Sequence, residues 1–385
     1  MSFIQPALAA ELADGVYEVR DLIFLKGFLA KKIFIEDPRR KVMLKAEVGA
    51  RIVSVKDGFA VCARGGAGYE GDLFLIFRGT TLNNYGADVV SDLRFGVERS
   101  KTGLPVHVGF NHAFTSMLTQ LRTFLAGNLS GITRIHCVGH SLGGAVATLA
   151  ADWVKSHTGL RVMLYTFGCP RVGFEFFSET VTTKLSSANI FRVYHETDPV
   201  PMVPVYPYSH TPAPGYGYYL PSSQMTVTGR AHKMAEYIAS VGGKTWKKIK
   251  GPPPLSSSEQ AVLKWLASDA PVSPMNPETW AFINAGLQWV LKKIMVGAAA
   301  ALQMSVMSVF TLADKISWLL LKGIDLAKET GVWVLRVMRK IMQALGMRVV
   351  KSVEQLTRAF MRNILERLIR KTTEEAVRAL RGMIG

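Results

Sequence analysis

Ile135-His136-Cys137-Val138-Gly139-His140-Ser141-Leu142-Gly143-Gly144-Ala145 is the stretch of sequence that decides the fold. Its first four residues predict a buried strand, and the small residues that follow, through Ala151, predict a helix. The middle fits G-x-S-x-G, a pattern that places a serine on a sharp turn from strand to helix. A side chain at Gly139 or Gly143 would collide with the neighbouring elements, which explains the two glycines. Ser141 is therefore the predicted nucleophile.

Further strands and helices alternate on both sides of this turn. Short β-branched runs predict strands at 50–55, 59–63, 73–77, 162–167 and 190–195, and residues 111–125 predict a helix. Alternation of strands and helices is typical of a mostly parallel sheet that is covered by helices. The sequence thus predicts an α/β fold.

A nucleophilic serine needs a base, and the base needs a carboxylate that orients it. In folds with this serine turn the three follow the order Ser, Asp, His. Asp198 follows the strand 190–195 directly and precedes Pro199, so it is the predicted acid, although an Asp-Pro turn would look the same. Two histidines come later, His210 and His232. His232 lies at the start of a predicted helix after a long loop, which favours it as the base over His210.

The negative charge that develops on the substrate oxygen needs hydrogen-bond donors. The backbone N–H of Leu142, directly after the nucleophile, is the first predicted donor. The second should follow an early strand, and Thr80 follows the strand 73–77. Taken alone, Gly79-Thr80 is better explained as a plain turn.

With these residues in place, the sequence resembles the class 3 lipase family over roughly residues 20–240. The resemblance rests on five ordered blocks: Phe-Arg-Gly-Thr (77–80), Val-His-Val-Gly-Phe (106–110), Gly-His-Ser-Leu-Gly-Gly-Ala (139–145), Thr-Phe-Gly-Cys-Pro-Arg-Val-Gly (166–173) and Asp-Pro-Val-Pro with Pro204 (198–204). It implies an α/β-hydrolase-type sheet, hydrolysis of lipid esters without a cofactor or metal, and the site roles already given. Those roles are catalytic for Ser141, Asp198 and His232, and oxyanion-binding for Thr80 and Leu142.

The sequence departs from the family pattern at three places. Cys169 stands where the family often has Gln, and the interval from Asp198 to His232 is shorter than in the fungal members. The lid of the fungal members is not evident in residues 82–88.

The size and charge of the chain indicate a second unit after the catalytic part. The chain has 385 residues, which exceeds the usual size of one core. We expect a catalytic domain over 1–242, a linker rich in Pro, Gly and Ser over 243–277, and a helical region over 278–385. Residues 286–385 contain seventeen Lys and Arg against seven Asp and Glu, and so carry +10 of the net charge of +17.

The helical region combines this charge with apolar runs. Residues 294–313 contain no charged side chain, and charged residues flank this run on both sides. A run of twenty such residues can span a bilayer or form a buried hairpin. From Ile316 onward apolar residues recur at helical spacing beside Lys and Arg, as in interfacial helices or in helices that pack on one another. The charge favours an anionic membrane surface as partner. Nucleic acid is not expected, since no reading motif accompanies the charge.

The remaining features concern compartment and partners. The three cysteines form no metal-type spacing and predict buried, reduced thiols, and the N-terminus does not read as a secretion signal. The architecture is loosely similar to phospholipase toxins that contact-dependent systems inject, which implies export without a signal. An inhibitor, immunity or chaperone protein is a separate candidate partner. We predict a lipase or phospholipase. The alternative is a non-enzymatic, membrane-permeabilising or partner-binding protein on the same scaffold.

Overall fold

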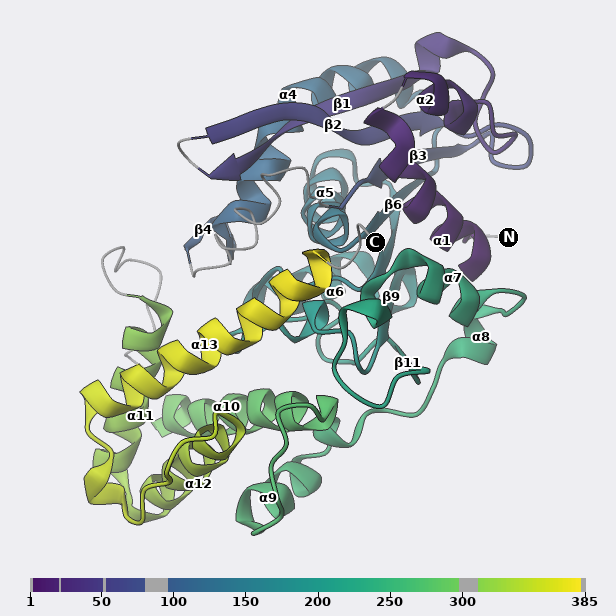
Figure 1. Cartoon of the computed structure of the whole chain (residues 1–385). Helices are drawn as coiled ribbons and strands as arrows, with labels where there is room; N and C mark the ends of the chain where they lie inside the picture. The colour runs from purple at the N-terminus through teal and green to yellow at the C-terminus, as the bar shows by residue number, and fades with distance from the viewer. Residues whose placement is uncertain (1–2, 21, 51–52, 80–95, 298–310, 382–385) are drawn as a thin grey trace.

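The computed structural model of the chain describes residues 3–20, 22–50, 53–79, 96–297 and 311–381 (Figure 1). Within these residues the centre is a seven-stranded sheet in the order β1-β2-β3-β6-β7-β9-β11. Its strands are β1 Lys41–Ala50, β2 Val53–Arg64, β3 Asp72–Phe77, β6 Arg134–His140, β7 Arg161–Phe167, β9 Ile190–His195 and β11 Tyr218–Leu220. The first three strands are antiparallel neighbours, and from β3 onward neighbouring strands run parallel. The predicted α/β class with a mostly parallel sheet is confirmed.

A small antiparallel sheet accompanies the central one. It has the order β10-β8-β5-β4, with β4 Val97–Arg99, β5 Pro105–His107, β8 Gly173–Phe174 and β10 Tyr208–Ser209. These short strands lie in the segments that follow β3, β7 and β9 along the chain.

One predicted strand is wrong. Residues 50–55 were expected to form a single strand, but Ala50 ends β1 and pairs with Val53, the first residue of β2. The chain therefore reverses inside the predicted segment. Apolar residues lie on both sides of this reversal, so composition did not mark it.

Helices cover both faces of the central sheet. They are α1 Pro6–Gly15, α2 Leu22–Leu29, α4 Val108–Asn128, α5 Leu142–Thr158, α6 Glu175–Leu185, α7 Met234–Val241 and α8 Trp246–Ile249. Side chains of β3 show how the faces divide, because successive residues of a strand point to opposite sides. Leu75 packs with α4, α5 and α6, whereas Phe74 and Ile76 pack with α1 and α7. Both faces are buried, which matches the continuous apolar run of β3.

The C-terminal part is helical and has a core of its own (Figure 1). Its helices are α9 Glu259–Ala267, α10 Pro277–Gly297, α11 Leu312–Leu326, α12 Lys328–Ala344 and α13 Arg358–Arg381. Helix α11 begins with a capping box, since the Thr311 hydroxyl accepts from the Asp314 backbone N–H while the Asp314 carboxylate accepts from Thr311 N. The predicted helical character of this region is confirmed for the described residues.

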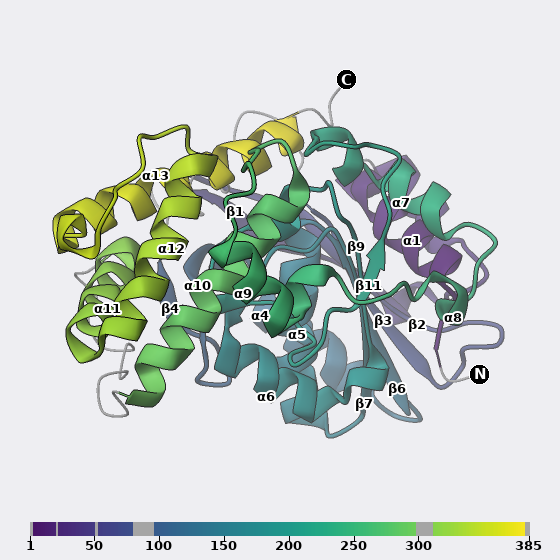
Figure 2. The same cartoon turned by 90° about the horizontal axis from the view of Figure 1, so that it is seen from below.

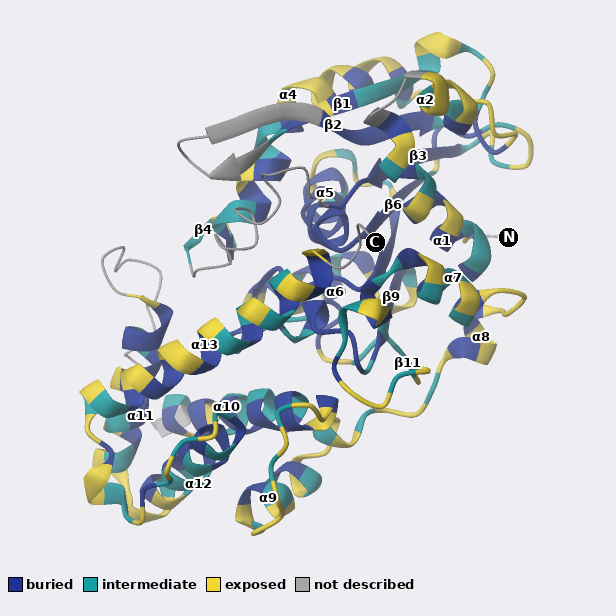
Figure 3. Ribbon diagram, viewed as in Figure 1, coloured by how far each residue is buried: buried dark blue, intermediate teal, exposed yellow. Residues whose placement is uncertain are grey.

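The apolar stripes of this region face its own core. Leu319 of α11, Val337 and Ile341 of α12 and Leu365 of α13 are all buried in one cluster. Figure 3 shows α13 with one buried and one exposed face along its length. These apolar stripes, which could also have formed interfacial helices, thus pack against one another. This is the second of the two interpretations that the sequence allowed.

The predicted linker over 243–277 contains ordered helices. Trp246 of α8 is 5% exposed, packs on the catalytic core and donates from its indole Nε1 to the carbonyl of Ile4 at 2.8 Å. Helix α9 packs on α10 through Val262 and Leu266. The segment is therefore more structured than its Pro, Gly and Ser content suggested.

The last turns of α13 return to the catalytic part. Ala376, Ala379 and Leu380 are buried in the core that contains α4, α5 and α6. The backbone of Gly229 lies so close that a Cβ there would stand 2.6 Å from the Ala379 Cα. The last turns of α13 are thus part of the catalytic core.

Across the ranges that the structure describes, the helices all fall short of the combined length and apolarity that a bilayer span requires. Most of the uncharged run 294–313 lies outside the described residues. Helix α10 ends at Gly297 and α11 begins at Leu312.

Candidate active site

Ser141 lies on the turn between β6 and α5, as the sequence predicted. Its φ of 57° and ψ of −130° place it in a region that residues with side chains rarely adopt. The flanking glycines make this turn possible: a Cβ at Gly139 would lie 2.2 Å from the Gly143 carbonyl oxygen, and a Cβ at Gly143 would lie 2.2 Å from the Phe77 carbonyl oxygen. The serine is thus held at the carboxyl end of a central strand and at the N-terminus of a helix.

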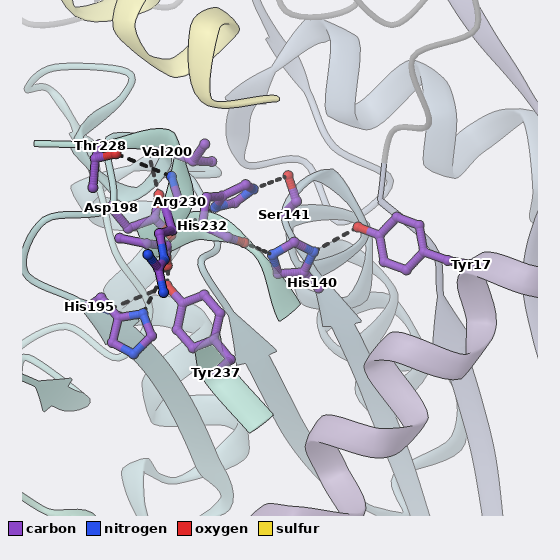
Figure 4. A network of polar contacts seen from close by, with 11 residues as sticks. Tyr17, His140, Ser141, His195, Asp198, Val200, Thr228, Arg230, His232 and Tyr237 are labelled. Atoms are coloured by element: carbon purple, nitrogen blue, oxygen red, sulfur yellow. Dashed lines mark hydrogen bonds and ion pairs between the residues drawn. The ribbon is translucent and has the colours of Figure 1, made fainter. Parts of the chain in front are cut away.

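The structure brings Ser141, His232 and Asp198 together in hydrogen-bond order (Figure 4). The Ser141 Oγ donates to His232 Nε2 at 2.9 Å, and His232 Nδ1 donates to Asp198 Oδ2 at 2.7 Å. The three residues are 1%, 0% and 1% exposed. This is the geometry in which a histidine can take the proton of a serine while a carboxylate fixes its tautomer.

His210, the other candidate base, does not join this group. Its Nε2 donates to the Pro201 carbonyl at 2.9 Å. Burial, together with the nearby Arg192 and Arg171, lowers its pKa well below the usual value. His210 is therefore an uncharged, internally bonded side chain.

Of the two predicted oxyanion donors, only Leu142 can be placed. It is the first residue of α5, so its N–H is one of the free donors at the helix N-terminus. Thr80 lies outside the described residues, which end on this side at Gly79.

Asp198 is held by two further donors. The Val200 N–H donates to Asp198 Oδ1 at 2.9 Å, and the Tyr237 hydroxyl donates to Oδ2 at 2.7 Å. Tyr237 comes from α7 and is fully buried, and burial beside this carboxylate raises its pKa well above the usual value. The hydroxyl therefore stays protonated and donates to Asp198, while it accepts from the His195 backbone N–H at 3.3 Å, and both oxygens of the acid are fixed.

Gly168 makes room for the His–Asp contact. It has a φ of 53°, and a Cβ at this position would lie 2.8 Å from Asp198 Oδ2 and 2.9 Å from His232 Nδ1. Any side chain would therefore push the pair apart. The glycine belongs to the block 166–173, whose role the sequence did not reveal.

His140 supports the base from the opposite side (Figure 4). Its Nε2 donates to the His232 carbonyl at 2.9 Å, and the hydroxyl of Tyr17 donates to its Nδ1 at 2.7 Å. Burial and the neighbouring His232 lower the pKa of His140 well below the usual value, so the ring is neutral with one donor and one acceptor nitrogen. His195 adds a third contact, from Nδ1 to the carbonyl of Ala231 at 2.8 Å.

Sequence reasoning missed these supporting residues. Tyr17 and Tyr237 lie 124 and 96 positions away from Ser141 along the chain, and no local pattern relates them to it. His140 could have been found, because it is the variable residue inside the G-x-S-x-G turn and is rigidly placed by it.

Other reactive groups take no part in this arrangement. The three cysteines are buried and unpaired, as predicted, and burial raises the pKa of Cys169 to about 12. The described residues contain no cluster of three or more side chains that could hold a metal ion.

A serine on a strand-to-helix turn of a mostly parallel sheet, with histidine and aspartate aligned behind it, defines an α/β-hydrolase-type domain. Residues 74–207 match the family model described as lipase (class 3). The predicted resemblance is thereby confirmed.

Curated relatives match the same part of the chain. A secreted mono- and diacylglycerol lipase of Fusarium solani is 39% identical over 113 residues, which cover 28% of this chain and 33% of the relative. A lipase of Rhizomucor miehei is 27% identical over 48% of this chain and 49% of the relative. The toxin TseL of Vibrio cholerae is 36% identical over 26% of this chain and 15% of the relative. The chain thus spans at most about half the length of these relatives.

Solved structures of fungal lipases are also similar. The triacylglyceride lipase of Rhizomucor miehei is 21% identical, with 57% of this chain and 79% of that chain covered and a TM-score of 0.40. A mono- and diacylglycerol lipase variant of Penicillium cyclopium is 22% identical, with 67% and 93% covered and a TM-score of 0.41.

Proposed function

We propose that the chain is a serine-dependent lipid ester hydrolase of the lipase or phospholipase A type. The observation that carries this proposal is the alignment of Ser141, His232 and Asp198 through hydrogen bonds of 2.9 and 2.7 Å. The match to the class 3 lipases and the names of the relatives support lipid esters as the substrate class.

In the proposed reaction, His232 takes the proton of Ser141 as Oγ attacks the ester carbonyl. Asp198 stabilises the imidazolium that forms, and the N–H groups of Leu142 and Thr80 hold the oxyanion. His232 then returns the proton to the leaving alcohol. Water, activated by the same histidine, releases the acid from the acyl-enzyme and restores the serine.

The buried environment of the three residues suits this chemistry. Charges that develop away from water interact more strongly with fixed dipoles, and the supporting bonds from His140 and Tyr237 keep the dipoles in place. A bilayer or micelle would deliver the ester to this site from one side.

We further propose that the protein acts at anionic membranes and serves as an exported effector. The positive charge of residues 286–385 supports the first point, and the similarity to a bacterial toxin supports the second. An effector of this kind needs a neutralising protein in the cell that makes it. The proposed substrate is the carboxylic ester bond of a lipid, which both lipases and phospholipases cleave.

The experiment compares wild type with Ser141→Ala on a short-chain ester and on mixed phospholipid and diacylglycerol vesicles, with released acids identified by mass spectrometry. Ser141→Ala should lose turnover by on the order of 10⁶-fold, as in other triads. The lipid that wild type consumes identifies the substrate. If Ser141→Ala damages vesicles as strongly as wild type and neither protein releases acid, the scaffold is non-enzymatic and the proposal is wrong.

A further inference from the structure

A cavity of about 640 Å³ lies apart from the catalytic serine, between the β9–β11 edge of the central sheet and helix α10. The catalytic part contributes Arg171, Arg192 and His210 to its wall, and α10 contributes Trp280 and Phe282. Figure 2 views the molecule from the side on which α9 and α10 lie. Asp198 of the triad borders this cavity, whereas Ser141 and His232 do not line it.

Arg192 is a buried cation with unused donors. Its side chain is on β9 and the residue is 3% exposed. Nη2 donates to the Tyr216 carbonyl at 2.8 Å, and the guanidinium carbon stands 3.8 Å from the centre of the Tyr194 ring. Within the described part of the chain, Nε and Nη1 have no hydrogen-bond partner.

Arg171 is a second cation beside it. It is 8% exposed, and among its side-chain nitrogens Nη1 alone donates hydrogen bonds, to the carbonyls of Met202 and Pro204. Burial, and next the positive charge of Arg192, lower the pKa of Arg171. Among the described residues no carboxylate lies within ion-pair distance of either guanidinium.

Four carboxylates line the same cavity, those of Glu175, Glu196, Asp198 and Glu278. Glu175 pairs with Lys292 and accepts from Gln288, Glu196 accepts from the hydroxyl of Tyr219, and Asp198 accepts from His232 in the triad. Burial, and next the positive charges of Arg192 and Arg171, lower the pKa of His210 in the same wall.

Two adjacent buried cations without a counter-ion cost free energy, and an oxyanion against them would offset that cost. Guanidinium groups are well suited to bind phosphate or carboxylate, because their N–H groups form a planar fork. The rest of the wall includes Tyr206, Trp280 and Phe282, which suit an apolar or aromatic moiety. We propose that this cavity is a second ligand site, which binds a small organic phosphate or carboxylate against Arg171 and Arg192.

The site would join the two parts of the chain. Its cationic wall belongs to the catalytic part, and α10 contributes Trp280 and Phe282 to its aromatic lining. A ligand that binds only the folded protein stabilises it, and the stabilisation grows with the logarithm of the ligand concentration once this exceeds the dissociation constant. The proposal does not depend on the ester hydrolase activity, because its test measures binding.

The test uses the full chain and isothermal titration calorimetry. The probes are phenyl phosphate and benzoate, with benzyl alcohol as the uncharged counterpart and inorganic phosphate as the headgroup alone. We expect one or both organic anions to bind to wild type and benzyl alcohol to bind much more weakly. The two anions distinguish a phosphate site from a carboxylate site.

Variants then locate the binding. Arg171→Met should lower the affinity about 10- to 100-fold, because a hydrogen-bonded charge is lost, and Arg171→Lys should restore part of it. Lys292→Met is the matched control, since Lys292 lies at the wall but is 48% exposed and already paired, and it should change the affinity less than about fivefold.

A second variant guards against misfolding of the arginine variants. Ala285→Trp, in the wall that α10 supplies, fills the cavity and leaves both guanidinium groups intact, so it should abolish binding. The proposal is overturned if folded wild type binds neither organic anion at millimolar concentration. It is equally overturned if Lys292→Met weakens binding as much as Arg171→Met, or if folded Ala285→Trp binds normally.

Discussion

His140 donates a hydrogen bond from Nε2 to the backbone carbonyl of His232, at 2.9 Å. The residue that precedes the nucleophile therefore holds the backbone of the base. Because β6 fixes His140 and Ser141 together, the base is positioned relative to the serine by the same rigid turn. Tyr17 completes the link by donating to the other ring nitrogen.

This relationship predicts that His140→Ala lowers kcat about 100-fold with little change in KM, because a misplacement of the base by about 1 Å has that effect. Steady-state kinetics on a soluble ester measure it. Tyr17→Phe keeps the ring and removes only one donor, so its loss should be smaller. A His140→Ala enzyme with wild-type kcat would show that the contact does not position the base.

The sequence allowed Ser141 to be predicted because strand, turn and helix are contiguous. It also favoured His232 over His210 through chain order and its place before a helix. The structure shows His210 bonded to Pro201, as its alternative interpretation required.

The supporting contacts could not be predicted, since they join segments far apart in the chain. Tyr237 meets Asp198 only because α7 packs on the sheet beside β9, and Gly168 meets it through a loop after β7. The hairpin inside 50–55 and the ordered linker helices were missed for a different reason. At the hairpin, the composition is similar on both sides of the reversal. In the linker, turn residues dominate the composition, although Trp246 is buried.

Asp198→Asn should fold and lose turnover on the order of 10⁴-fold, because the amide cannot hold the imidazole in the required tautomer. Tyr237→Phe leaves the carboxylate and removes one of its donors, so its loss should be far smaller. Single-turnover kinetics together with circular dichroism separate lost chemistry from lost structure. Near-normal turnover of Asp198→Asn would remove this residue from the triad.

Gly168→Ala should lower kcat on the order of 100-fold, since the new Cβ would stand 2.8 Å from Asp198 Oδ2 and displace the His–Asp pair. The matched control is Gly159→Ala, at the end of α5. Gly159 also has a positive φ, 69°, but has no neighbour within 4 Å of its Cβ position. Both variants should lose about 1–2 kcal/mol of stability from backbone strain, and only Gly168→Ala should lose activity. Equal activities of the two would mean that the site tolerates the displacement.

Stability should fall as the pH drops below about 6.5. Burial lowers the pKa of His136, His140, His195 and His210 in the folded protein. Below the unfolded pKa, the unfolded chain binds protons that the folded chain does not, so the free energy of unfolding rises with pH in this window. Each histidine contributes up to about 1.4 kcal/mol per pH unit.

Urea unfolding at neutral pH and at about pH 5 measures how the free energy of unfolding depends on pH. The lower pH lies below the pKa of a histidine in the unfolded chain. His140→Gln and His210→Asn should each reduce the slope, because each removes one such group. A free energy of unfolding that is independent of pH over this window would contradict the prediction.

The membrane role of the C-terminal region is tested best by its exposed charges. Removal of the helices would not be a clean test, because Ala376, Ala379 and Leu380 belong to the catalytic core. The outer face of α13 offers Arg367, Arg370 and Arg381, which are exposed.

The triple change of these three arginines to Gln should weaken binding to phosphatidylglycerol vesicles on the order of 100-fold, at about 1 kcal/mol for each basic residue near the surface. Activity on a soluble ester should persist, since the changed side chains lie on the outer face. The matched control changes Lys244, Lys247 and Lys248 to Gln, which removes the same charge from exposed positions around α8. Vesicle flotation measures both proteins against phosphatidylcholine vesicles.

Salt distinguishes surface attraction from insertion. Charges are screened over about 8 Å at physiological ionic strength, so higher salt should release wild type if attraction alone holds it. Retention at high salt would indicate that an apolar segment inserts. Equal losses in the two triple variants would show that net charge, rather than α13, drives adsorption. Wild type that fails to float with anionic vesicles at low salt would exclude the membrane role of this region.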